Sequence, residues 1–83
     1  CLLGNLALEV SNENIEFKEV IKEYFTAWEN ALFNIFKNKY DESKARDIAK
    51  EYVALIQGSI MMMNLYDNPS SYLQVGEKLI SLI

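Results

Sequence analysis

Residues 54–65 read ALIQGSIMMMNL and lie in a segment, from about residue 44 to 66, whose apolar residues recur at helical spacing. At about 100° per residue they form two stripes on opposite sides of one helix. The second stripe is confined to the C-terminal half, because Asp47, Lys50 and Glu51 occupy that side earlier. A helix that is apolar on two sides is packed on two sides. The broad stripe comprises Ala45, Ile48, Ala49, Tyr52, Val53, Ile56, Ile60 and Met63, and the second Ala54, Gly58, Met61, Met62 and Leu65.

The second stripe predicts contact with another copy of the chain. Ala54 and Gly58 are small and would let another helix approach closely. A glycine inside a water-soluble helix lowers helix stability by ~1 kcal/mol relative to alanine, so it usually has a packing reason. Two-fold dimers are the commonest oligomers. The alternative is that helices upstream of residue 1 cover this face. The predicted dimer interface comprises Ala54, Gly58, Met62, Leu65, Tyr72, Val75, Gly76 and Leu79.

Three further helical segments flank this one. They run over residues 1–10, from about 15 to 39, and from Pro69 to the last residue. Asn14 is the expected N-cap of the second segment, and Asp41 and Ser43 are candidate caps for the third. No stretch shows the strict alternation of a half-buried strand. We therefore predict one all-α domain over residues 1–83, an antiparallel bundle of about four helices whose last two form a dimeric four-helix bundle.

The composition limits the classes of partner. The chain has 83 residues, 51% of them hydrophobic, with a net charge of -4 and a pI of about 4.7. No apolar run approaches the eighteen or more residues of a membrane span, so we expect a water-soluble, cytoplasmic protein without one. The acidic balance disfavours direct nucleic-acid binding, which needs clustered basic residues. The one local basic group, interpreted as a solvated cluster beside a turn, is Lys37, Lys39 and Lys44.

The residue types also argue against an enzyme site. The chain has no His and one Cys, which excludes the usual zinc sites and His-based nucleophiles, so we expect no metal, no cofactor and no catalytic residues. Met61, Met62 and Met63 point in different directions on a helix and cannot converge on one ion. The acidic and basic residues near the start of the second segment are interpreted as a solvated helix face: Glu16, Lys18, Glu19, Lys22 and Glu23.

An aromatic cluster suggests a ligand cavity. Tyr24, Phe25 and Trp28 lie on the second segment, while Tyr52 and Gln57 bring polar groups from the third. Cavities between bundle helices are mostly apolar with a few polar groups, and this set has that character. A plain aromatic core is an equally good interpretation of any single residue. Gln57 is more telling, because an amide beside an apolar stretch needs a hydrogen-bond partner, which a ligand could supply.

The order of several motifs resembles the C-terminal regulatory domain of TetR-family transcriptional repressors. They are CLLGNLALE at residues 1–9, a long helix with Phe25 and Trp28-Glu29, LIQGS at 55–59, and Asp67-Asn68-Pro69. The resemblance covers essentially the whole chain. It implies an all-helical domain that binds a small hydrophobic or aromatic effector and forms a homodimer. It also implies DNA binding through an N-terminal helix-turn-helix domain that residues 1–83 do not contain.

In that family the effector lies among the middle helices and shifts the dimer away from DNA. The resemblance and the aromatic cluster together give an expected lining of Leu3, Ala7, Tyr24, Phe25, Trp28, Gln57 and Met61. Some members sense oxidants through a cysteine near this opening motif. Cys1 is expected to be a buried structural thiol instead, since no Lys or Arg precedes Lys18 to lower its pKa.

Two alternatives stay open. The opening in mid-helix at Cys1 predicts a fragment of a longer protein, although a mature lipoprotein also begins with Cys. The competing function is a ligand-free helical interaction or assembly module. A basic helix-turn-helix domain upstream would favour the regulator.

Overall fold

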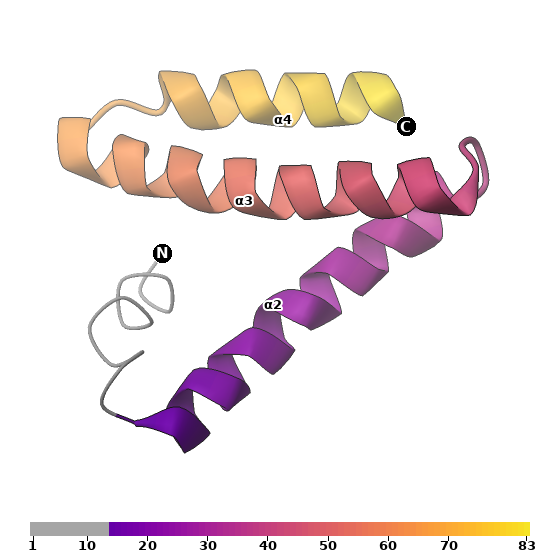
Figure 1. Cartoon of the computed structure of the whole chain (residues 1–83). Helices are drawn as coiled ribbons and strands as arrows, with labels where there is room; N and C mark the ends of the chain where they lie inside the picture. Colours follow the sequence, from indigo (N-terminus) through magenta and orange to yellow (C-terminus); the bar gives the residue numbers. More distant parts are fainter. Residues whose placement is uncertain (1–13) are drawn as a thin grey trace.

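The computed structural model describes residues 14–83, which form three helices: α2 (Ile15–Phe36), α3 (Glu42–Tyr66) and α4 (Ser70–Leu82) (Figure 1). The all-α prediction is confirmed for this part of the chain. The helix predicted over residues 1–10 lies outside the described residues, as do Cys1, Leu3 and Ala7. The dimeric bundle stays a prediction.

The first two described helices begin at the caps that the sequence predicts. The Asn14 side chain accepts a hydrogen bond from the Phe17 backbone N–H at 2.8 Å, and that of Asp41 accepts one from Lys44 at 2.9 Å. Each satisfies an N–H group that has no partner inside its helix. Asp41, and not Ser43, is the cap of α3. Helix α2 ends at Phe36, three residues before the predicted end, because Lys39 and Tyr40 both donate to the Phe36 carbonyl in a tight turn.

The connection from α3 to α4 turns at Asp67. Asp67 has φ 51° and ψ 40°, the left-handed conformation that commonly ends a helix. The Asn68 backbone N–H donates to the Met63 carbonyl at 3.2 Å, and the Asn68 side chain accepts from Ser70 at 2.9 Å. Pro69 therefore stands just before α4 instead of forming its first turn, one residue from the predicted start.

Helix α3 is the central element of the described chain. Helix α4 runs antiparallel beside it, while α2 meets α3 near the turn and diverges from it toward residue 15 (Figure 1). The Tyr40 hydroxyl donates to the Leu82 carbonyl at 3.1 Å, which ties the α2–α3 turn to the end of α4. Helix α2 is thus close to the other two helices near the turn and spreads away from α3 toward residue 15, while α4 stays beside α3 (Figure 1).

The buried core is small and lies where α2 and α4 meet α3. Only Phe36 combines a large side chain with essentially complete burial, and its ring packs edge-on against Tyr40 with centroids 6.2 Å apart. Most of the core comes from the broad stripe of α3, which confirms that stripe as the side packed within the chain. The buried apolar residues are Ile21, Phe36, Ala45, Ala49 and Tyr52.

The second stripe of α3 is exposed on the far side of the helix from these buried residues. Met61 and Met62 are 44% and 42% exposed, and Leu65 is 68% exposed. A Cβ atom built on Gly58 would meet nothing within 4 Å. The packing reason that the sequence suggests for this glycine is therefore not found among residues 14–83.

Candidate ligand-binding site

The largest described cavity opens between α2 and α3 on the diverging side of their contact. Its volume is about 490 Å³, within the range of small-molecule sites. Its apolar walls come from both helices, and charged side chains stand around it. The lining residues are Lys18, Ile21, Lys22, Phe25, Thr26 and Glu29 of α2 and Lys50, Val53, Ala54 and Gln57 of α3.

Gln57 brings an unsatisfied amide to this cavity. Its Oε1 and Nε2 atoms are both buried, and neither has a hydrogen-bond partner in the part of the chain that the structure describes. Leaving a buried polar group unpaired costs about 1–3 kcal/mol. This side chain, which can both donate and accept, belongs to the lining of the cavity.

The aromatic cluster of α2 divides between two cavities. The Phe25 ring lies on the larger one, whereas Trp28 lines a second cavity of about 290 Å³ with Ala27, Ala31, Leu32 and Ile56. The centroid of Trp28 is 5.8 Å from that of Phe25 and 5.4 Å from that of Tyr24. Packing against Trp28 thus stiffens the wall that Phe25 presents to the larger cavity.

The structure brings together only part of the predicted lining. Phe25 and Gln57 line the larger cavity and Trp28 the smaller. Tyr24 contacts both rings but lines neither cavity, and Met61 is on the exposed outer face of α3. Sequence periodicity gives the side of a helix on which a residue lies, but not whether a neighbouring helix is close enough to enclose it.

The predicted dimer residues are distributed over both sides of the α3–α4 pair. On α3, Ala54 lines the larger cavity, while the remaining predicted positions are exposed. On α4, Val75, Gly76 and Leu79 are half-buried, and Tyr72 is 42% exposed. Contact of any of them with a second copy stays a prediction.

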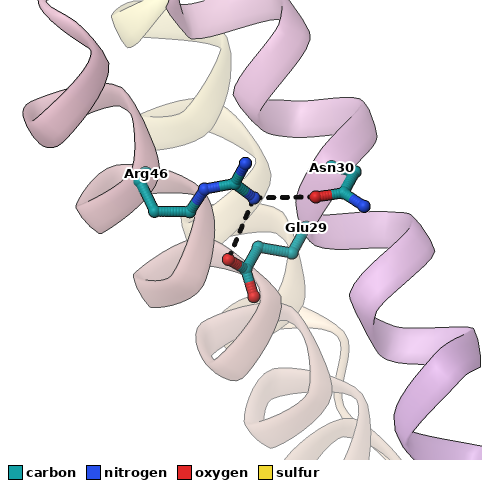
Figure 2. Close-up of polar contacts among 3 residues, drawn as sticks. All are labelled: Glu29, Asn30 and Arg46. Atoms are coloured by element: carbon teal, nitrogen blue, oxygen red, sulfur yellow. Dashed lines mark hydrogen bonds and ion pairs between the residues drawn. The ribbon is translucent and has the colours of Figure 1, made fainter.

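A polar network joins α2 and α3 between the cavity and the α2–α3 turn (Figure 2). Arg46 Nη1 donates to Glu29 Oε1 at 3.1 Å and to Asn30 Oδ1 at 2.8 Å, and its guanidinium lies 4.0 Å from the centroid of the Phe33 ring. Arg46 is the chain's only arginine. The planar guanidinium fixes the two helices by hydrogen bonds and ring contact at once. The sequence did not predict this network, because Arg46 lies 13 to 17 positions along the chain from its three partners. No local pattern connects residues that far apart.

The lysines around the cavity correct the interpretation of the α2 surface. Glu19 and Lys22 do form the exposed pair expected of a solvated face, with 3.3 Å between Lys22 Nζ and Glu19 Oε1. Lys18 instead is half-buried and lines the cavity, as Lys50 of α3 also does. Lysine stems commonly cover apolar surface in this way while the charged end stays near water.

Among residues 14–83, no three acidic, His or Cys side chains are grouped closely enough to hold a metal ion. No helix of that range has both the length and the apolar character needed to cross a membrane.

Comparison with known proteins gives one match. Residues 1–78 match the family model described as "Transcriptional regulator LmrA/YxaF-like, C-terminal domain", one of the TetR C-terminal domain models. No curated protein and no solved structure matches the chain significantly.

Proposed function

Because the chain belongs to the LmrA/YxaF-like family of TetR C-terminal domains, we propose that its α2–α3 cavity binds a small, largely apolar effector. Membership of this family supports a role as the regulatory domain of a transcription regulator, the part that binds effectors and forms dimers. The observation that carries the proposal is the buried amide of Gln57, which has no hydrogen-bond partner among residues 14–83 and belongs to the wall of an apolar cavity.

The shape of the site suggests how binding would be transmitted. Arg46 fixes α2 and α3 to each other near the turn (Figure 2), and the two helices diverge beyond it (Figure 1). An effector between the diverging parts would favour one angle of α2 over another. The effector shifts the equilibrium between two conformations of the domain only if it binds one of them more tightly than the other. In a repressor dimer, the effector-bound conformation would hold the two DNA-reading domains at a spacing that no longer fits the operator.

The second part of the proposal is dimer formation through the outer face of α3. Met61, Met62 and Leu65 form a continuous exposed apolar strip beside Gly58, which leaves room for a close approach. Exposed apolar patches of this kind commonly mark interaction sites. A ligand-free assembly module would use the same strip to form dimers. Binding of a ligand in the cavity is therefore what distinguishes an effector-responsive regulator from such a module.

A compound screen tests the effector proposal. The full protein is screened by thermal shift against small apolar and aromatic compounds, and hits are tested for release of operator DNA that the same protein has selected from random sequences. We expect compounds that raise the melting temperature to release DNA as well. Gln57→Leu should abolish both effects, whereas Gln74→Leu, on an exposed face of α4, should abolish neither. DNA release without stabilisation would contradict binding in this cavity, and the absence of both would favour the assembly module.

A further inference from the structure

The charge around the α2–α3 cavity is opposite in sign to that of the whole chain. The domain carries 12 acidic and 8 basic residues, for a net charge of -4. The cavity is nevertheless lined by three lysines, Lys18, Lys22 and Lys50, and by a single carboxylate, Glu29. A locally cationic site in an acidic domain raises the local concentration of anions and disfavours cations.

Two of these four charges already have partners. Glu29 accepts a hydrogen bond from Arg46 at 3.1 Å, so its negative charge is compensated from outside the cavity. Lys22 pairs with Glu19 at 3.3 Å on the exposed surface of α2. Lys18 and Lys50 form no ion pair with any residue of the range 14–83. They come from different helices that line the same cavity, Lys18 half-buried on α2 and Lys50 exposed on α3.

The other lining residues favour a mostly apolar molecule that carries one polar group, placed where it meets the buried Gln57 amide. Ile21, Phe25, Val53 and Ala54 provide the apolar surface, and Gln57 offers a donor and an acceptor that nothing in the described chain satisfies. An apolar hydrocarbon would leave the amide unpaired, and a small inorganic anion would leave the apolar surface in contact with water.

We infer that the effector is an amphipathic organic anion. Its apolar body packs on Phe25 and the aliphatic side chains, a polar group meets the Gln57 amide, and its carboxylate or other acidic group lies between Lys18 and Lys50. The inference rests on the proposed function, because it assigns a chemical class to the ligand of that same cavity. An ammonium-bearing ligand would place its charge against two unpaired lysines.

Matched pairs of probes separate charge from shape. Naphthalene-2-carboxylate and its carboxamide, biphenyl-4-carboxylate and its carboxamide, and decanoate and decanamide are titrated into the full protein by calorimetry. In each pair the apolar body and the planar polar group are conserved while the charge is lost. We expect at least one carboxylate to bind roughly fivefold or more tighter than its amide at low salt, as about 1 kcal/mol per partly exposed charge pair implies. The advantage should shrink as NaCl screens the lysines.

Lysine variants locate the charge contact. Lys18→Gln and Lys50→Gln should each remove most of the preference for the carboxylate and leave the affinity for the amide unchanged. Lys78→Gln, on the exposed side of α4, is the matched control and should change neither. Gln57→Leu should weaken both members of a pair, because both face the same amide.

The outcomes separate this inference from the proposed function. Equal binding of carboxylate and amide, with both sensitive to Gln57→Leu, would overturn the anion assignment and leave the cavity as the effector site. A carboxylate preference that survives both lysine variants would also overturn it. Failure of every carboxylate to bind, while the broader screen yields ligands sensitive to Gln57→Leu, would overturn the anion alone. Failure of all compounds would overturn both.

Discussion

At the scale of single residues, Gln57 and Arg46 differ in whether their polar groups have hydrogen-bond partners. The guanidinium of Arg46 has two hydrogen bonds and an aromatic ring against it, whereas both amide atoms of Gln57 are buried without a partner in the described part of the chain. Buried polar groups without partners are rare in folded proteins, and they concentrate where a ligand or water completes the set. Arg46 therefore serves the fold, and Gln57 has the character expected of a binding residue.

Replacing Gln57 by leucine tests its energetic state directly. We expect Gln57→Leu to raise the free energy of unfolding by about 1 kcal/mol, because an unpaired buried amide is replaced by an apolar group of similar size. Urea denaturation measures the change, with Gln74→Leu as the exposed control, for which we expect little effect. A loss of stability at position 57 would mean that the amide has a partner in the free protein.

Removing the Arg46 guanidinium should have the opposite effect. Arg46→Met keeps most of the aliphatic stem but loses the contacts with Glu29, Asn30 and Phe33. The pair with Glu29 is partly exposed, at 36% and 21% of the two side chains, so we expect a loss of only about 1–2 kcal/mol in urea denaturation. Lys78→Met, which removes an exposed charge on α4, should cost a small fraction of that. Equal effects would show that the network does not fix α2 on α3.

At the scale of the helices, the boundaries follow from local hydrogen bonding. Asn14 and Asp41 cap the two long helices, and Asp67 and Asn68 end one helix and lead into the next. These interactions join residues two to five positions apart, so the chain specifies them wherever the helices later pack. The left-handed backbone at Asp67 is the costly conformation among residues 14–83, since a side chain disfavours it.

Asp67→Gly should stabilise the domain. Glycine adopts positive φ without the steric cost of a Cβ atom, so we expect a gain of up to about 1 kcal/mol in the free energy of unfolding. The matched variant Glu51→Gly, at an exposed position inside α3, should lower the free energy of unfolding by about 0.5–1 kcal/mol. Thermal or urea denaturation measures both. A loss at Asp67→Gly would indicate that the aspartate side chain contributes more than its backbone strain costs.

At the scale of the whole molecule, apolar surface exceeds what the chain covers. Thirteen large apolar side chains of the described part are exposed, on all three helices, while five apolar residues form the buried core. Small domains of this kind have little stability to spare, so covering such surface by association is favourable. The outer strip of α3 and the exposed side of α4 are the two surfaces available near the C-terminus.

Charge substitutions identify which of these surfaces joins two copies. We expect the wild-type chain to sediment as a dimer and Met62→Glu with Leu65→Glu to sediment as a monomer, because the substitutions would bury two unpaired carboxylates. The matched pair Leu73→Glu with Ile80→Glu alters α4 residues that are 57% and 71% exposed and lie outside the predicted interface. That pair should leave the dimer intact. Dissociation by the α4 pair alone would move the interface to α4.

The sequence by itself determined the three helices of the described part, two of their caps and the two-sided character of residues 54–65, and it singled out Gln57 as a candidate contact for a ligand. These depend on 3.6-residue periodicity and on contacts within a few positions, which the order of residues fixes. Only the tertiary structure decided that Lys18 and Lys50 face one cavity with Ala54, that Met61 and Tyr24 do not line it, and that Arg46 meets Glu29 and Asn30. These facts depend on the angle at which α2 crosses α3, and that angle results from the packing of side chains far apart in the sequence.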